Sequence, residues 1–220
     1  FSANGKGADL SGVLDRRPAG ATPAVTYRAN GDDNLLVEYG AMELDLSMRA
    51  RVHVLADQIA AAGLEGIVDL TPGVRTLQVH FDPRATSLRH MLDSVGALEE
   101  TLPSSDELEV PSRAIHLPLS WDDPVTHEAT ARYAAGVRAD APWCPWNIEF
   151  IRRINGLDDV EDVRRIVFDA TYLVLGLGDV YLGAPLATPI DPRHRLVTTK
   201  YNPARTCLLY TSPSPRDRQK

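Results

Sequence analysis

The order of short apolar segments between residues 24 and 98 constrains the fold more than any other feature of this chain. Two predicted strands, Ala24–Ala29 and Leu35–Tyr39, flank an Asn-Gly-Asp-Asp turn, whose residues tolerate positive φ or cap their own backbone. Asp45 then suits the N-cap of a helix that runs to about Ala62. The apolar residues of this helix recur at alternating spacings of four and three: Met48, Val52, Leu55, Ile59 and Ala62.

A second pair of strands and a second helix follow. Ile67–Leu70 is a short apolar segment, a Thr-Pro-Gly turn comes next, and Thr76–Phe81 alternates apolar and polar residues as a half-buried strand does. The following helix presents an apolar face: Leu88, Leu92, Val95 and Leu98. Two strand pairs that each end in a helix predict an α+β lobe with two layers, helices packed on a sheet.

The second half of the chain has a different texture. A further strand is predicted at Ile115–Leu119, followed by three helices that end near Val137, Ile154 and Phe168. The second of these helices stops at an Asn-Gly pair, which is a helix-ending signal. From Tyr172 onward, short apolar segments alternate with Gly and Pro, a pattern typical of strands entering a barrel or sandwich.

Composition excludes several classes of protein. The 220 residues are 44% hydrophobic and 24% charged, which indicates a globular chain. The net charge of −7 and the sequence pI of about 5.3 argue against a nucleic-acid surface, which needs a basic face. The two cysteines, Cys144 and Cys207, form neither a disulfide framework nor a zinc spacing, so we expect the reducing cytoplasm. No apolar run approaches a membrane span. The chain opens at Phe1 without a signal-peptide pattern, and we expect its N-terminus to lie in a longer parent protein.

A long collinear stretch of the sequence resembles one known family. The segments that carry the resemblance are Tyr27–Gly40, Gly66–Asp82, VPSRAIHLPLSWDD at Val110–Asp123, PWNIEFIRRINGL at Pro145–Leu157, and Val167–Thr206. They resemble the carboxyltransferase region of urea carboxylase, which is also the urea carboxylase part of urea amidolyase. More distantly they resemble the allophanate hydrolase subunit 1 family, which includes a kinase-autophosphorylation inhibitor and one 5-oxoprolinase subunit. A match of this length is far more specific than a short motif.

The resemblance implies an α+β fold in two lobes. Residues 24–112 would form a small ferredoxin-like lobe, and residues 113–206 an incomplete cyclophilin-like β-barrel with a helical insertion. Residues 1–23 lack a hydrophobic period and are predicted to be a linker. Residues 207–220, CLLYTSPSPRDRQK, break the family pattern and resemble translated sequencing-adapter DNA. A natural Ser/Pro-rich end is the alternative interpretation of this tail.

The resemblance also implies a reaction. The parent would transfer a carboxyl group from carboxybiotin to urea to give allophanate, with biotin on a carrier domain and ATP used at a separate biotin carboxylase domain. The partners implied are these two domains and a second carboxyltransferase half that resembles allophanate hydrolase subunit 2. Because the pocket needs that second half, we expect the isolated fragment to be inactive.

Polar side chains after the apolar run are the candidate site. Asn202 offers both a donor and an acceptor, which matches urea, while Lys200 and Tyr201 can donate and Arg205 can bind a carboxylate through two bonds. Asp179, in a Gly-Leu-Gly-Asp run, could accept from urea or biotin. The family resemblance favours Asn202 over its neighbours as a contact of urea. We predict catalytic roles for Asn202 and Asp179 and binding roles for Lys200, Tyr201 and Arg205.

Structural interpretations of the same residues stay open. Asn202 and the following proline could form a turn, Arg205 could be a surface charge, and Asp179 could cap a tight turn between strands. No metal site is predicted, because His116 and His194 have no HxxxH or CxxC partners. Cys144 is interpreted as a buried structural thiol rather than a nucleophile.

Two other functions remain as alternatives. One is an ATP-dependent enzyme component that resembles a 5-oxoprolinase subunit, and the other is a non-enzymatic module that inhibits a kinase. The segments SWDDP, INGLDDVEDV and VTTKYNPART favour urea carboxylase over both.

Overall fold

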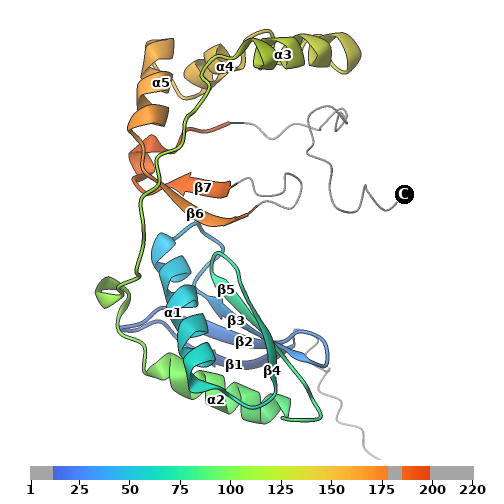
Figure 1. Ribbon diagram of the computed structural model, residues 1–220, viewed down its shortest axis with the longest axis vertical. Coiled ribbons are helices and arrows are strands. Elements are labelled where there is room, and N and C mark those ends of the chain that lie inside the picture. The colour runs from blue at the N-terminus through green and yellow to red at the C-terminus, as the bar shows by residue number, and fades with distance from the viewer. Residues whose placement is uncertain (1–11, 178–184, 199–220) are drawn as a thin grey trace, which may run out of the picture. The chain divides into compact units, whose positions relative to one another are not determined.

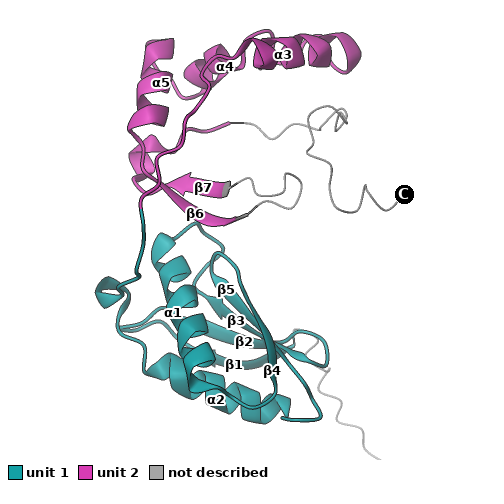
Figure 2. Cartoon of the chain, viewed as in Figure 1, with its two compact units in different colours: residues 1–113 teal, residues 114–220 magenta. Residues whose placement is uncertain are grey.

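The computed structural model describes residues 12–177 and 185–198. The chain divides into two compact units, residues 1–113 and residues 114–220, shown in Figure 2. Each unit has its own sheet and its own helices. In the ranges described, no helix combines the length and the apolar character that crossing a membrane requires.

The first unit is a five-stranded antiparallel sheet with two helices on one face (Figure 1). The strand order is β1-β2-β3-β5-β4, and every neighbouring pair is antiparallel. The strands are β1 Val13–Arg17, β2 Val25–Ala29, β3 Asn34–Tyr39, β4 Ile67–Pro72 and β5 Thr76–Phe81. The helices are α1 Leu46–Ala62 and α2 Leu88–Glu100, and a 3-10 turn, η1, follows at Ser105–Glu107.

Alternation along the central strands builds the core of this unit. Every second residue of β3 and β5 is fully buried: Leu35, Val37, Tyr39, Leu77, Val79 and Phe81. The register sets Leu35 opposite Val79 and Val37 opposite Leu77, so their side chains stack on one face of the sheet. Val52, Leu55 and Ile59 of α1 complete the same cluster, as do Met91 and Val95 of α2. The sequence prediction of a helix-on-sheet α+β unit is therefore confirmed.

Local signals explain where the helices begin and end. The Asp45 side chain accepts a hydrogen bond from the Ser47 N–H at the start of α1, as its position predicts. Gly63 ends the helix in the left-handed region at φ +60°, which glycine adopts without steric cost. The Ser87 side chain caps α2 by accepting from the His90 N–H.

The segment predicted as a linker, residues 1–23, contains a strand, so that prediction was wrong for Val13–Arg17. β1 has one acidic and two basic residues in five and no apolar alternation that marks a strand. It forms because it pairs with β2 and because Arg17 bonds to α2, donating to the Gly96 carbonyl over 3.1 Å. The contact with Gly96 joins residues 79 positions apart, and no local pattern in the sequence indicates it.

In its described residues, the second unit holds three helices and a two-stranded antiparallel sheet. The helices are α3 Pro124–Gly136, α4 Asn147–Ile154 and α5 Val160–Asp169. The strands are β6 Tyr172–Leu177 and β7 Pro185–Pro189, and a 3-10 turn, η2, covers Pro192–His194. Residues 12–177 and 185–198 contain no closed barrel.

The strand predicted at Ile115–Leu119 is not formed. The segment is exposed, with Ile115 at 64% and Leu117 at 72% of full exposure. Its residues alternate as a strand requires, but strand formation also needs a neighbouring strand to pair the backbone. In the described part of the chain this segment has no such neighbour.

Candidate functional site

The five residues predicted to form the site lie outside the described residues. They are Asp179, Lys200, Tyr201, Asn202 and Arg205. The structure does describe the segments that lead to them: β6 ends at Leu177, two residues before Asp179, and residues 190–198 end two residues before Lys200. The contacts described below are therefore those of the segments next to these residues in the chain.

Charged side chains in the turn after β7 form hydrogen bonds to other groups of the same turn. Arg195 donates from Nε to the Pro189 carbonyl over 3.0 Å and from a terminal nitrogen to the Ile190 carbonyl over 3.3 Å. The Asp191 carboxylate accepts from the side chain and the backbone N–H of Arg193, and these bonds lower the pKa of Asp191 well below its usual value. The segment that leads to residue 196 therefore begins with a hydrogen-bonded turn.

The amide side chain of Asn155 binds the backbone near the end of the described segment 190–198. Asn155 accepts from the Val197 N–H over 2.7 Å, and its Nδ2 donates to the Val197 carbonyl over 2.8 Å. The same Nδ2 donates to the Ile151 carbonyl of α4 over 2.8 Å. The sequence interpretation used Asn155 only as a helix stop and missed this contact, because its partner lies 42 residues away.

Local geometry explains why Asn155 can reach Val197. The residue is the C-cap of α4, at φ −95° and ψ 1°, and Gly156 follows in the left-handed region at φ +64°. The chain therefore turns away at once, and the Asn155 side chain remains at the helix end. Arg152 supports this turn by donating to the Leu157 carbonyl over 2.8 Å.

A second polar group lies before α3. The Asp122 Oδ1 accepts from the Trp146 Nε1 over 2.8 Å and lies 2.8 Å from the His127 Nε2. The His127 and Trp146 rings stack with centroids 6.5 Å apart. Asp122 has a φ of +53°, which is uncommon for a residue other than glycine. These contacts join the start of α3 to the start of α4.

Among the described residues, Cys144, His116 and His194 do not form a catalytic or metal-binding group. Cys144 is half-buried, and its Sγ lies 3.5 Å from the Thr130 carbonyl, a contact that suits a structural thiol. His116 is exposed, and His194 ends the η2 turn. Over residues 12–177 and 185–198, no three His, Cys, Asp or Glu side chains are grouped so that they could hold a metal ion.

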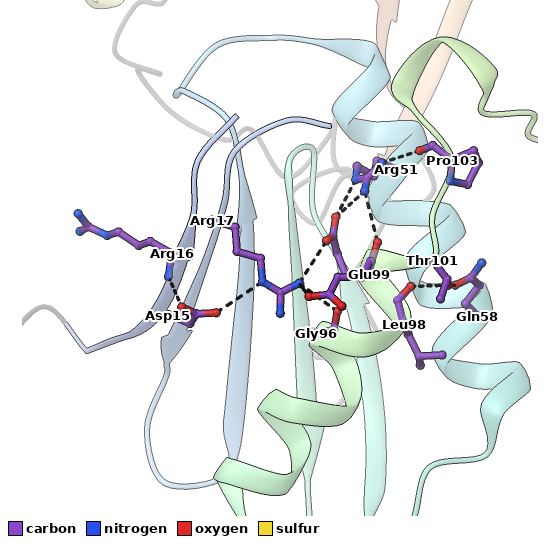
Figure 3. A network of polar contacts seen from close by, with 11 residues as sticks. Asp15, Arg16, Arg17, Arg51, Gln58, Gly96, Leu98, Glu99, Thr101 and Pro103 are labelled. Carbon is purple, nitrogen blue, oxygen red and sulfur yellow. Dashed lines mark hydrogen bonds and ion pairs between the residues drawn. The ribbon is translucent and has the colours of Figure 1, made fainter. Parts of the chain in front are cut away.

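The first unit holds a buried charge network, shown in Figure 3. Arg51 is fully buried and donates to Glu99 Oε1 from Nε over 2.9 Å and from a terminal nitrogen over 2.5 Å. Its remaining terminal nitrogen donates to the Pro103 carbonyl over 2.8 Å. Arg17 joins the network from β1 by pairing with Glu100 over 2.8 Å. Each charge of the network has a partner of opposite charge inside the first unit, so the network does not suit substrate binding. It joins α1, α2 and β1.

Two buried tyrosines surround this network. The Arg51 guanidinium lies 5.6 Å from the centre of the Tyr39 ring, and that of Arg17 lies 5.3 Å from the Tyr27 ring. Burial raises the pKa of both hydroxyls far above the usual value, and the negative charge of Glu99 raises the pKa further. The raised pKa keeps both hydroxyls protonated near neutral pH.

Comparisons with known families and proteins find matches over most of the chain. Residues 25–210 match the family described as carboxyltransferase domain, subdomain C and D. The chain is 40% identical over 185 residues to the urea amidolyase of Lachancea kluyveri and 37% identical over 185 residues to that of Saccharomyces cerevisiae. Each match covers 84% of this chain and 10% of the relative, so the chain spans about a tenth of the length of these curated relatives.

Solved structures are similar over most of the chain. The crystal structure of the Kluyveromyces lactis urea carboxylase matches with a TM-score of 0.69 and 37% identity, over 89% of this chain and 17% of that one. The crystal structure of the urea amidolyase from K. lactis matches with the same TM-score and identity, over 89% of this chain and 12% of that one.

Proposed function

The chain belongs to the family of carboxyltransferase domains, subdomain C and D, and from this premise we propose that it serves a urea carboxylase that converts urea to allophanate. The observation that carries the proposal is the 40% identity over 185 residues to a urea amidolyase. The similarity to a solved urea carboxylase over 89% of the chain supports it further. These relatives favour urea carboxylase over a 5-oxoprolinase component or a kinase inhibitor.

The residues of the run from Lys200 to Arg205 fit the chemistry of the substrate. Urea needs an acceptor for its N–H groups and a donor for its carbonyl, and the amide of Asn202 supplies both. Lys200 and Tyr201 add donors, and Arg205 matches the planar carboxylate that the product acquires. Asp179 would accept from a urea N–H. Donors of this kind act best where water is excluded.

Biotin, when bound as the carboxylated form, would supply the carboxyl group. We place its carrier domain, an ATP-using biotin carboxylase domain and a second carboxyltransferase half among the partners of this chain. The proposed compartment is the cytoplasm, since the cysteines form no disulfide framework.

We extend the proposal to the architecture of the two units. The first unit would be the ferredoxin-like lobe, and β6 and β7 would belong to an incomplete cyclophilin-like barrel. A two-stranded sheet is marginally stable alone, and the exposed apolar residues of the second unit suit strands that are completed by further chain. Those residues include Ile115, Leu117, Val174 and Leu186. An incomplete barrel cannot exclude water, so the isolated chain should not carboxylate urea.

Alanine substitution in the full-length enzyme that contains this chain tests the proposal. Asn202→Ala should lower urea carboxylation by about 10²–10³-fold, as loss of a donor to the reacting group does. The double variant with Arg205→Ala should be weaker still. Arg89→Ala is the matched control, because Arg89 belongs to the first unit, is 78% exposed in its side chain and pairs with Asp93. Full turnover by the double variant would show that the proposed site is wrong.

A further inference from the structure

We infer that the connector between the two units, residues 108–120, is a cleavage site for an endopeptidase of trypsin-like specificity, which cuts the bond between Arg113 and Ala114. This inference is independent of the proposed function. The boundary between the two compact units falls at the same bond, since the first unit ends at Arg113 and the second begins at Ala114. A single cut there would therefore separate the two units of this chain.

The backbone of the connector is open to solvent. Every residue from 111 to 120 is exposed, and residues 108–120 contain neither helix nor strand. No hydrogen bond joins the backbone of residues 108–119 to another residue that the structure describes. An extended peptide is bound by a partner through its own backbone N–H and carbonyl groups. The connector offers these groups to a protease without prior unfolding, as the preferred sites of proteolytic cleavage do.

The side chain of Arg113 determines which class of protease fits the connector. Between Arg89 and Arg132 it is the sole lysine or arginine of the sequence. Its guanidinium suits a specificity pocket that has a carboxylate at its base. In the reaction, the protease serine forms an ester with the Arg113 carbonyl carbon while the Ala114 nitrogen leaves as an amine with the serine proton. One water molecule then hydrolyses the ester, which gives a carboxylate at Arg113 and restores the serine.

Each end of the connector is anchored in its own unit. On the first side, Leu102 is 5% exposed and belongs to the core, and the Pro103 carbonyl accepts from the buried Arg51 over 2.8 Å. On the second side, the Trp121 ring packs edge-on against Phe168 of α5, with centroids 5.7 Å apart. A cut between these anchors therefore breaks none of the contacts that hold them.

The first unit should remain folded after the cut. Its core cluster lies within residues 25–102, and its five strands and two helices all end before residue 101. The fragment that ends at Arg113 thus keeps every element of the sheet and both helices. A unit with its own core can fold by itself.

A second Arg-Ala pair, Arg138 and Ala139, provides an internal comparison. The Arg138 side chain is 52% exposed, but its Nε donates to the Asp140 carboxylate over 3.0 Å. Its backbone N–H donates to the Tyr133 carbonyl over 3.3 Å. A protease can bind this pair in extended form only after these bonds open, so its cleavage follows the population of the opened form. The same pair of residues in the connector needs no such opening.

The test is brief digestion of the 220-residue chain with trypsin, followed over time by intact mass spectrometry. The polypeptide that begins at Ala114 should appear at least about tenfold faster than the one that begins at Ala139, because only the second needs a local opening. The fragment that ends at Arg113 should resist further cutting within residues 25–100. Equal rates at the two bonds would overturn the inference.

Two variants and a second protease separate the open backbone from the effect of one side chain. Arg113→Gln should remove the tryptic product, whereas Arg138→Gln, the matched control, should leave its rate of formation unchanged. Thermolysin, which cuts before large apolar residues, should still cleave Arg113→Gln before Ile115, Leu117 or Leu119, since the backbone there is equally exposed. A connector that thermolysin leaves intact while it cuts elsewhere in residues 25–177 would also overturn the inference.

Discussion

The two units use apolar residues in opposite ways. In the described part of the chain, fifteen of the nineteen buried apolar residues lie in the first unit. In the second unit, by contrast, the apolar residues of Ile115–Leu119 and several of β6 and β7 are exposed. The first unit therefore completes a core from its own sheet and helices. In its described residues the second unit leaves these apolar side chains exposed, as a surface that contacts another polypeptide does.

The three tryptophans allow the two units to be followed separately. Trp121, Trp143 and Trp146 all lie in the second unit. Tryptophan fluorescence therefore reports on the second unit, whereas far-UV circular dichroism reports on both. Guanidinium unfolding followed by both signals should reveal two transitions, one for each unit.

Removal of the buried carboxylate should have the largest effect. Glu99→Ala leaves Arg51 charged, fully buried and without its ion-pair partner, and should destabilise the first unit by about 3–5 kcal/mol. The transition seen by dichroism should move while the tryptophan transition stays in place. Glu161→Ala, which breaks an exposed ion pair of α5, should move neither transition. If both signals move together in Glu99→Ala, the units do not unfold independently.

Alanine substitution of one buried and one exposed leucine should give a difference of intermediate size in the free energy of unfolding. Leu55→Ala removes a fully buried side chain from α1 and should cost about 2–5 kcal/mol. Leu117→Ala changes an exposed residue of the predicted strand and should cost less than about 0.5 kcal/mol in the isolated chain. The measurement is the free energy of unfolding in guanidinium. A large cost for Leu117→Ala would mean that this segment is buried in solution.

The smallest effect is expected at a glycine inside α2. A Cβ at Gly96 would lie 2.8 Å from a terminal nitrogen of Arg17, so Gly96→Ala alone should be nearly neutral: the gain in helix propensity is offset by displacement of Arg17. In an Arg17→Ala background the same change should stabilise the first unit by about 1 kcal/mol. A double-mutant cycle measures the coupling. Equal effects in both backgrounds would show that Arg17 does not require the glycine.

Local patterns predicted the first unit well because its elements are defined by residues close in sequence. The N-cap at Asp45, the spacing of Val52, Leu55 and Ile59, and the alternation in Thr76–Phe81 all act within a few residues. The strand at Val13–Arg17 was missed because its polar composition carries no period, and it forms through pairing with β2.

The contacts of the second unit were harder to predict because they are long-range. The Asn-Gly pair at the end of α4 identified a helix stop, and nothing near it in sequence marks Val197 as the partner of Asn155. Ile115–Leu119 has the residues of a strand, but pairing depends on a neighbour that the described residues do not supply. Asn202 and Asp179 stay predictions, since they lie outside the described residues.

The ion pair between Arg51 and Glu99 also has an evolutionary consequence. The two residues are 48 positions apart, and loss of either one alone leaves the other's charge without a counterpart in the interior. Replacement of both by apolar residues of similar volume is far less costly. We therefore expect the two positions to co-vary as sequences diverge, so that relatives keep both charges or exchange both together.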